Sequence, residues 1–131
     1  NVDWLTEWSW PVLANAKTSK TDYAHALRCA RKLVELAPHR PYHLTLLGAA
    51  LYRTGDLDGA RKMLDTVQPA SMFVPYVRGP ANLFLAMVHH KSGRPDEAAK
   101  VLAIGERVNW GLLQGEHGAL VDEARALLQQ K

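Results

Sequence analysis

The feature of this sequence that most constrains its fold is a pattern of small and apolar residues that occurs more than once. Residues 47–64, LGAALYRTGDLDGARKML, carry apolar residues at helical spacing on both sides of Gly55 and Asp56. Glycine tolerates a positive φ at the end of a helix, and aspartate caps the helix that follows. The segment therefore predicts two antiparallel helices joined by a tight turn. The same order of residues returns around Gly93, 38 positions after Gly55, so we expect an array of helix pairs.

Apolar residues at spacings of three and four predict helices along most of the chain. The clearest stretch begins at Asp22 and continues to Ala37, with charged residues on its opposite face. Pro38 and Pro41 end this helix and admit the next one. We expect further helices at 43–54, 57–68, 81–92, 95–108 and 116–130, and no segment has the alternation of a strand. The predicted fold class is therefore all-α.

Two stretches are less regular. In residues 1–22, Pro11 removes a backbone donor, so we expect either a helix that kinks there or one that starts near Ser9. Residues 69–80 hold three prolines and one glycine. For this stretch we expect an ordered loop or a helix extension, packed by Met72, Phe73 and Tyr76.

Three alanines mark corresponding positions of the repeat. Ala26 and Ala60 are 34 positions apart, and Ala60 and Ala98 are 38 apart, with the four extra residues in the proline-rich stretch. Two helices per 34 residues, with Leu-Gly in the first helix and Ala in the second, resemble the tetratricopeptide repeat family. The residues that carry this resemblance are Trp10, Leu13, Ala14, Ala30, Leu33 and Pro38 in the first unit, Leu44, Leu47, Gly48, Leu51, Tyr52 and Leu64 in the second, and Leu85, Ala86, Leu102 and Gly105 in the third.

The resemblance implies a single domain over residues 1–131, built as a short right-handed superhelix of stacked helix pairs. Its expected parts are repeats at about 7–40, 41–74 and 79–112, an irregular loop at 69–80 and a capping helix at 116–130. The first unit departs from the family pattern because it has no turn glycine, and the third has Asn82 where a large apolar residue is usual. The phrases ARKLVELAP, TLLGAALYRTGD and LFLAMVHHKSGRPDEA are similar to repeats of multidomain bacterial proteins that carry a kinase or a β-propeller domain.

The resemblance also implies that the first helix of each pair lines a concave groove for a protein or peptide. Family members that grip the C-terminal carboxylate of chaperones need polar or basic groove residues where this chain has Pro11, Ala49, Pro80 and Phe84, so we expect no such clamp. Aromatic and basic residues on the groove face suit a peptide with some acidic character. The expected groove residues are Asn15, Tyr42, Thr45, Tyr52, Arg53, Leu83, Met87, His90 and Lys91.

Composition excludes several classes of protein. The 131 residues include 16 basic and 13 acidic side chains, and no run of four Lys or Arg occurs, which argues against a dedicated nucleic-acid arm. No apolar run approaches the ~20 residues that a membrane span needs, and the N-terminal residues lack the pattern of a signal peptide. The single cysteine, Cys29, fits a reducing compartment, so we expect a cytoplasmic protein. Because the sequence does not start with Met, we expect a domain cut from a longer chain.

Six histidines raise the question of a metal or catalytic site. His39 and His43 have ligand-like spacing, but Pro41 lies between them, and His89 and His90 point about 100° apart on a helix. No cysteine or carboxylate completes a ligand set in the sequence, and no catalytic triad order or phosphate loop stands out. We therefore expect no enzyme, no metal and no cofactor, and we expect Cys29 to be a small buried or half-buried residue rather than a nucleophile.

The N-terminal tryptophans admit two interpretations. Trp4, Trp8 and Trp10 either pack the core of the first helix or form an exposed edge that docks to another domain or a second copy. The second interpretation makes Trp4 and Trp8 edge contacts and predicts self-association, because an unpaired repeat edge is apolar.

Three hypotheses for the function follow. The favoured one is a non-catalytic scaffold that binds a protein or peptide segment, with some acidic character, in the groove. The second is an intramolecular spacer that orients neighbouring domains of a larger protein. The third, a helical-repeat nucleic-acid binder, is motivated by the pI of about 9.2 and is disfavoured by the intermixed acidic residues, so we expect no nucleic-acid or membrane partner.

Overall fold

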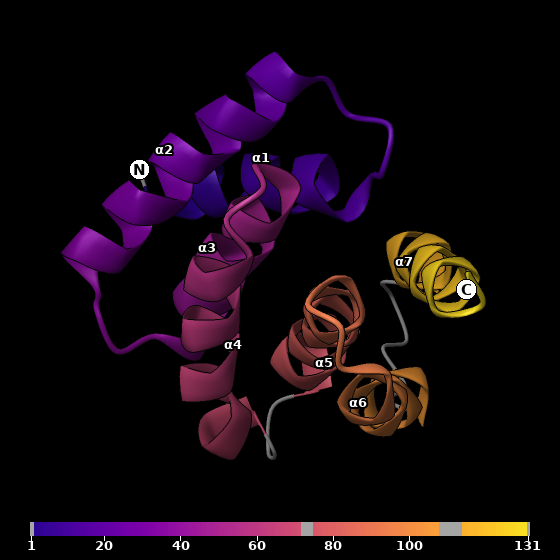
Figure 1. The fold of residues 1–131 in the computed structure, drawn as a ribbon. Coiled ribbons are helices and arrows are strands. Elements are labelled where there is room, and N and C mark those ends of the chain that lie inside the picture. Colours follow the sequence, from indigo (N-terminus) through magenta and orange to yellow (C-terminus); the bar gives the residue numbers. More distant parts are fainter. Residues whose placement is uncertain (1, 72–74, 108–113, 131) are drawn as a thin grey trace.

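The computed structural model describes residues 2–71, 75–107 and 114–130, and it describes side chains within 6–68, 77–107 and 118–130. This part of the chain forms helices joined by turns and contains no strand, which confirms the all-α prediction (Figure 1). The helices are α1 (Val2–Ala14), α2 (Lys20–Leu36), α3 (Pro41–Arg53), α4 (Leu57–Ser71), α5 (Pro75–Lys91), α6 (Pro95–Arg107) and α7 (Gln114–Leu128). None of the described helices is long and apolar enough to cross a bilayer.

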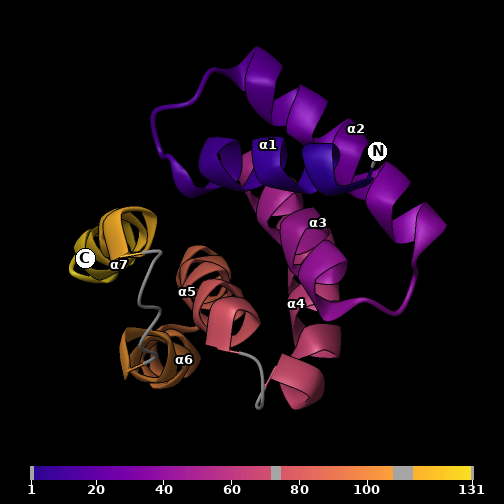
Figure 2. The ribbon, with the colours of Figure 1, turned by 180° about the vertical axis from the view of Figure 1, so that it is seen from behind.

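The helices pack pairwise and then stack. Helix α1 packs on α2, α3 on α4 and α5 on α6, while α2 and α4 also contact the pair that follows them. The first helices of the pairs contact one another in the order α1, α3, α5, whereas α2, α4 and α6 make no such contacts within the described residues. One side of the stack, which we call the inner face, is therefore lined by α1, α3 and α5 (Figures 1 and 2).

The second and third pairs share the same turn. Gly55 has φ +95° and Gly93 has φ +78°, values that suit glycine because it lacks a Cβ. After α3 the amide of Asp56 donates to the carbonyl of Leu51 at 2.9 Å, and after α5 the amide of Arg94 donates to His89 at 2.8 Å. Both are the hydrogen bonds of a Schellman motif. The predicted turn glycines are confirmed, and they impose the same geometry on both pairs.

Small residues allow the paired helices to approach closely. A Cβ added at Gly48 would lie 2.7 Å from Cγ of Leu64, and one added at Gly105 would lie 2.9 Å from Cγ of Leu83. Such distances are well inside van der Waals contact, so only glycine fits without a shift. Gly48 thus brings α3 onto α4, as its position in the repeat predicts, and Gly105 does the same for α6 and α5.

The proline-containing stretches are more helical than a loop prediction allows. Helix α4 continues through Pro69 to Ser71, and α5 begins at Pro75, so helices cover the described part of the expected loop at 69–80. Pro75 is the first residue of α5, where its missing amide hydrogen removes no helical bond. Residues 72–74 and the side chains of Met72, Phe73 and Tyr76 lie outside the described part. Likewise α1 runs from Val2 with Pro11 inside it, so the alternative start near Ser9 is wrong.

The C-terminal helix reaches further than the end of the stack. Helix α7 packs on α5 and α6, and it also contacts α1 at the opposite end of the inner face. Both ribbon views place α7 beside the end of α1 and beside α5 (Figures 1 and 2). The inner face is therefore partly covered by a helix of the same chain.

Candidate functional site

Arg53, the last residue of α3, lies at the centre of the inner face. Its Nε donates a hydrogen bond of 3.0 Å to the carbonyl oxygen of Leu13 in α1. Its side chain is only 6% exposed. Carbonyls in the last turn of a helix lack amide partners, so the end of α1 offers Leu13 as an acceptor. This bond fixes the plane and direction of the guanidinium group.

The other two guanidinium nitrogens bind Glu123 of α7. Nη1 donates to Oε2 at 2.5 Å, and Nη2 donates to Oε1 at 2.7 Å. Burial alone would lower the pKa of Arg53, but the hydrogen bonds and the negative charge of Glu123 outweigh it and raise that pKa. The guanidinium therefore stays protonated, and its two parallel bonds form the bidentate arrangement that arginine makes with carboxylates.

Aromatic rings enclose the guanidinium group. Its central carbon lies 5.2 Å from the ring centroid of Phe84 and 5.6 Å from those of Tyr23 and Tyr52. Burial, with the charge of Glu123, raises the pKa of Tyr52 to about 12, so this phenol stays neutral. The ammonium group of Lys91 lies 4.9 Å from the centroid of the Tyr52 ring. Cations over ring faces are stabilised by the ring quadrupole, so these rings favour positive charge here.

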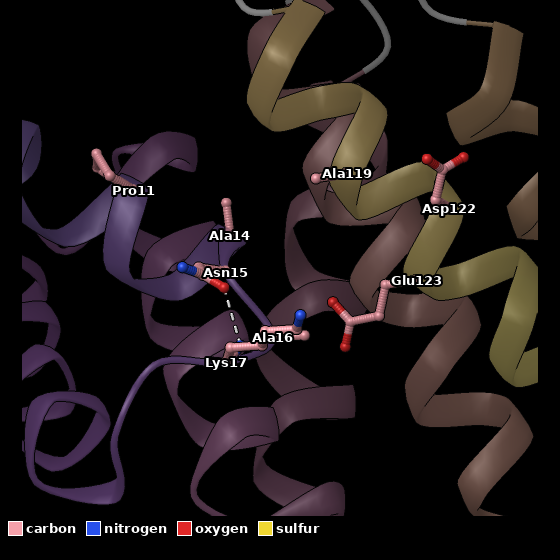
Figure 3. Close-up of a pocket in the computed structure, with 8 residues that line it drawn as sticks. All are labelled: Pro11, Ala14, Asn15, Ala16, Lys17, Ala119, Asp122 and Glu123. Carbon is pink, nitrogen blue, oxygen red and sulfur yellow. Dashed lines mark hydrogen bonds between the residues drawn. The ribbon is translucent and has the colours of Figure 1, made fainter.

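A cavity of about 640 Å³ opens beside this pair, between the end of α1 and α7. Figure 3 shows Glu123 of α7 pointing toward the turn that follows α1. In that turn, Oδ1 of Asn15 accepts the backbone amide of Lys17 at 2.9 Å, and the carbonyl of Asn15 accepts the hydroxyl of Tyr23. The lining combines small apolar side chains with polar ones: Pro11, Ala14, Ala16 and Ala119, and Asn15, Lys17, Asp122 and Glu123.

Comparison with protein families agrees with the helix pairs and their shared turns. A model of the tetratricopeptide repeat matches residues 12–75, and a second model of the same repeat matches residues 80–103. Residues 12–103 belong to the tetratricopeptide repeat family. No curated protein and no solved structure matches the chain. Tetratricopeptide repeats are generally protein–protein interaction modules and are typically non-catalytic, so the family resemblance inferred from the sequence is confirmed at that level.

Four of the nine residues predicted to line the tetratricopeptide groove, Arg53 itself with Asn15, Tyr52 and Lys91, belong to one network of contacts. The Tyr52 ring contacts the guanidinium group, and the ammonium of Lys91 lies over that same ring. The carbonyl of Asn15 accepts the hydroxyl of Tyr23, whose ring also contacts the guanidinium. Asn15 also lines the cavity. The inner face thus brings together residues from the ends of α1, α3 and α5.

The other five predicted groove residues lie elsewhere. Leu83 and Met87 are fully buried, and Thr45 is 2% exposed, because α5 and α3 are covered on several sides. Tyr42 is half-buried against the core. His90 lines a separate cavity of about 420 Å³ between α6 and α7.

The two candidate edge tryptophans belong to α1. Trp8 is half-buried, and its ring meets His25 of α2 edge to face at 4.9 Å. Trp4 is in α1, and its side chain is outside the described part. Trp10, by contrast, is a core residue that packs on Phe84 at 6.3 Å, which supports the core interpretation for that tryptophan.

His43, His89 and Cys29 are buried residues of the helix packing. His43 is 3% exposed, and its Nδ1 donates to the carbonyl of Leu33 at 3.1 Å. His89 is buried, and burial lowers the pKa of both imidazoles. Cys29 is buried, as expected, and burial raises the pKa of its thiol. Within the described ranges no three metal-ligating side chains gather in one place.

Sequence reasoning missed Glu123. From the amphipathic pattern of the last helix we expect Glu123, with Asp122 and Arg125, to lie outside as a solvent-facing charge. Instead it contacts Arg53, and only 22% of its side chain is exposed. Its spacing of three from Leu120 and four from Leu127 places Glu123, unlike Asp122, at the border of the apolar face. No local pattern identifies its partner, however, because Arg53 lies 70 positions earlier in the chain.

Proposed function

We propose that the chain is a non-catalytic interaction module that binds a peptide or protein segment at the inner face. The partner segment enters the cavity between α1 and α7. The observation that carries this proposal is the position of that cavity beside the ion pair of Arg53 and Glu123. It lies on the side of the stack lined by the first helices of the repeats.

The lining suits a peptide backbone. Pro11, Ala16 and Ala119 are exposed and small, so a chain can approach both walls closely. The amide nitrogen of Asn15 makes no hydrogen bond with the described residues and is free to donate to a peptide carbonyl. A volume of about 640 Å³ lies within the range of small-ligand sites and accommodates a few residues of a peptide.

We also propose the setting in which the module acts. The single cysteine supports a reducing, cytoplasmic location. Similarity of its repeat phrases to those of multidomain bacterial proteins supports a role as one module among several. Within such a protein, the cavity would receive a segment of a separate chain or of a neighbouring domain.

A pair of matched variants tests the site. Ala119 and Ala126 are both exposed residues of α7, but only Ala119 lines the cavity. Peptides of about twelve residues are selected from a random displayed library on the wild-type chain and then measured on Ala119→Trp and Ala126→Trp. We expect Ala119→Trp to weaken binding by at least about tenfold, because an indole fills the cavity, and Ala126→Trp to leave it unchanged. Equal binding to both variants, or a library without cavity-dependent binders, would contradict the proposal.

A further inference from the structure

We propose that Arg53 is the anchor for an acidic side chain of the partner, and that Glu123 occupies this anchor in the free chain. The inference rests on the proposed function, because the incoming carboxylate arrives through the cavity between α1 and α7. It adds the chemical class of the partner: a segment with an Asp or Glu residue.

The side chain of Arg53 is held in one orientation by its neighbours. Nε of Arg53 is held by the carbonyl of Leu13 at 3.0 Å, and the guanidinium carbon lies within 5.6 Å of three ring centroids. Both remaining nitrogens point the same way, toward the two oxygens of Glu123. A guanidinium fixed in this manner presents two parallel donors, which match the geometry of a carboxylate and of no neutral side chain.

The carboxylate is the accessible half of the pair. The side chain of Glu123 is 22% exposed, against 6% for Arg53, and Glu123 lines the cavity whereas Arg53 does not. Its carboxylate points from α7 into the space that faces the turn at Asn15 and Lys17 (Figure 3). A second carboxylate inside the cavity therefore reaches Arg53 from the side that Glu123 uses.

A carboxylate of the partner can replace that of Glu123 at Arg53 while helix α7 stays packed on the core. The backbone of α7 is held by Leu120 and Ala124, which are both fully buried in the core. The carboxylate of Glu123 is connected to that backbone by three single bonds, and rotation about them carries it away from Arg53. Helix α7 then still lines the cavity, and only the side chain of Glu123 has moved.

Charge determines which residue replaces Glu123. A buried guanidinium without a counter-ion is strongly unfavourable, so the incoming group must be anionic. Lys17 lines the same cavity and adds a second positive charge, whereas Asp122 adds a negative one. Because Asp122 disfavours a highly acidic peptide, a single acidic residue between small neutral ones fits this site best.

The internal contact also lowers the apparent affinity for such a partner. For a ligand that binds only the open state, the apparent dissociation constant equals the intrinsic one divided by the fraction of open molecules. Removing the carboxylate of Glu123 while keeping its size therefore strengthens binding of an acidic peptide. This gain of binding distinguishes an occupied anchor from a structural ion pair.

The first test uses the full chain and sodium acetate. Glu123→Ala leaves Arg53 without its carboxylate and enlarges the cavity. We expect acetate, compared with chloride at equal ionic strength, to raise the melting temperature of Glu123→Ala in a saturable way. The double variant Arg53→Met/Glu123→Ala should not respond. Glu106→Ala is a matched control, because it removes the carboxylate of another Glu–Arg pair, with Arg125 at 2.8 Å, outside this cavity. No acetate response in Glu123→Ala, or an equal response in Glu106→Ala, overturns the anchor.

The second test uses a variant that retains the size of the side chain. The probe is the blocked peptide acetyl-Gly-Ala-Glu-Ala-Gly-amide, whose only carboxylate is the side chain of its Glu residue. By NMR titration we expect it to bind Glu123→Gln at least about tenfold more tightly than the wild-type chain. The same peptide with Gln in place of Glu should show no such gain. Equal affinity of both peptides, equal affinity for both proteins, or no binding at all contradicts the inference.

The two proposals fail separately. Loss of binding in Ala119→Trp without any carboxylate preference would leave the cavity as the partner site and remove Arg53 as its anchor. Acetate rescue of Glu123→Ala, with peptide binding untouched by Ala119→Trp, would show that Arg53 accepts a free carboxylate and would overturn the cavity as the partner site.

Discussion

The guanidinium group of Arg53 binds the carboxylate of Glu123 through bonds of 2.5 and 2.7 Å, although 70 positions separate the two residues in the chain. The same guanidinium reaches the carbonyl of Leu13, so one side chain connects α3 to α7 and to α1. Helix α7 therefore lies beside the inner face, and a cavity is present between α7 and the end of α1.

The close approach of α3 to α4 gives a first prediction. Gly48→Ala places a Cβ 2.7 Å from Cγ of Leu64. We expect it to lower the free energy of unfolding by about 1–2 kcal/mol. An approach this close puts overpacking in the upper part of its usual range, about 2–3 kcal/mol, which exceeds the helix-propensity gain of alanine, about 1 kcal/mol.

Gly118 of α7 is the matched control for this change. A Cβ at Gly118 meets nothing within 4 Å, so Gly118→Ala should be neutral or stabilise the domain by up to about 1 kcal/mol. Urea unfolding measures both variants. If Gly48→Ala is as stable as the wild-type chain, α3 and α4 are not packed as described.

The buried amide of Asn82 gives a second prediction. Asn82 is fully buried in α5, where its Nδ2 donates to the carbonyl of Arg78 at 2.7 Å and its Oδ1 accepts Nε2 of Gln68 at 3.1 Å. This bond joins α4 to α5 and explains why a polar residue stands at an apolar repeat position. We expect Asn82→Leu to cost about 1–3 kcal/mol, because the half-buried amide of Gln68 loses this acceptor.

A double variant separates this hydrogen bond from packing. Gln68→Leu/Asn82→Leu removes both partners, so its unfolding free energy in urea should recover part of the loss. An Asn82→Leu chain at least as stable as the wild type would show that the bond makes no net contribution.

Acidic pH gives a third prediction. Burial lowers the pKa of His43 below 6.5, and the positive charge of Arg40 acts in the same direction, while the hydrogen bond to Leu33 opposes it. Burial likewise lowers the pKa of His89. The unfolded chain therefore binds protons more readily, so stability is full above about pH 6.5 and falls as the pH drops below that value toward the lowered pKa of the folded state.

The corresponding measurement is urea unfolding at about pH 7.5 and about pH 5.5. We expect the wild-type chain to lose stability over this interval and the double variant His43→Gln/His89→Gln to lose less. If the two chains show the same pH dependence, neither buried imidazole is coupled to folding.

The local pattern of the sequence predicted most of the fold. Apolar spacing within each helix, with Gly55 and Gly93 at the turns, depends only on neighbouring residues, and those helices and turns are present. The pattern was less informative between residues 69 and 80. There the three prolines are compatible with a loop and with a helix extension, because a proline such as Pro75 is tolerated in the first turn of a helix.

The candidate site was predictable only in part, because it depends on how α7 crosses the stack. Periodicity places charged residues of an amphipathic helix toward water, which is where Glu123 was expected. Burial of Leu83 and Met87 has a similar origin, since helical geometry identifies a face but does not show that several neighbours cover it. Arg53 was assigned to the inner face from sequence, but its partner there is a residue that no nearby segment specifies.

The most direct test of the central claim, that Arg53 and Glu123 form an ion pair shielded from water across the inner face, is a double-mutant cycle. Urea unfolding of the wild-type chain, Arg53→Met, Glu123→Gln and the double variant gives the coupling free energy. We predict a coupling of at least about 1.5 kcal/mol, as for charge pairs shielded from water. A coupling below about 0.5 kcal/mol, as between exposed ion pairs, would mean that Arg53 and Glu123 do not form a shielded pair in solution and would contradict this claim.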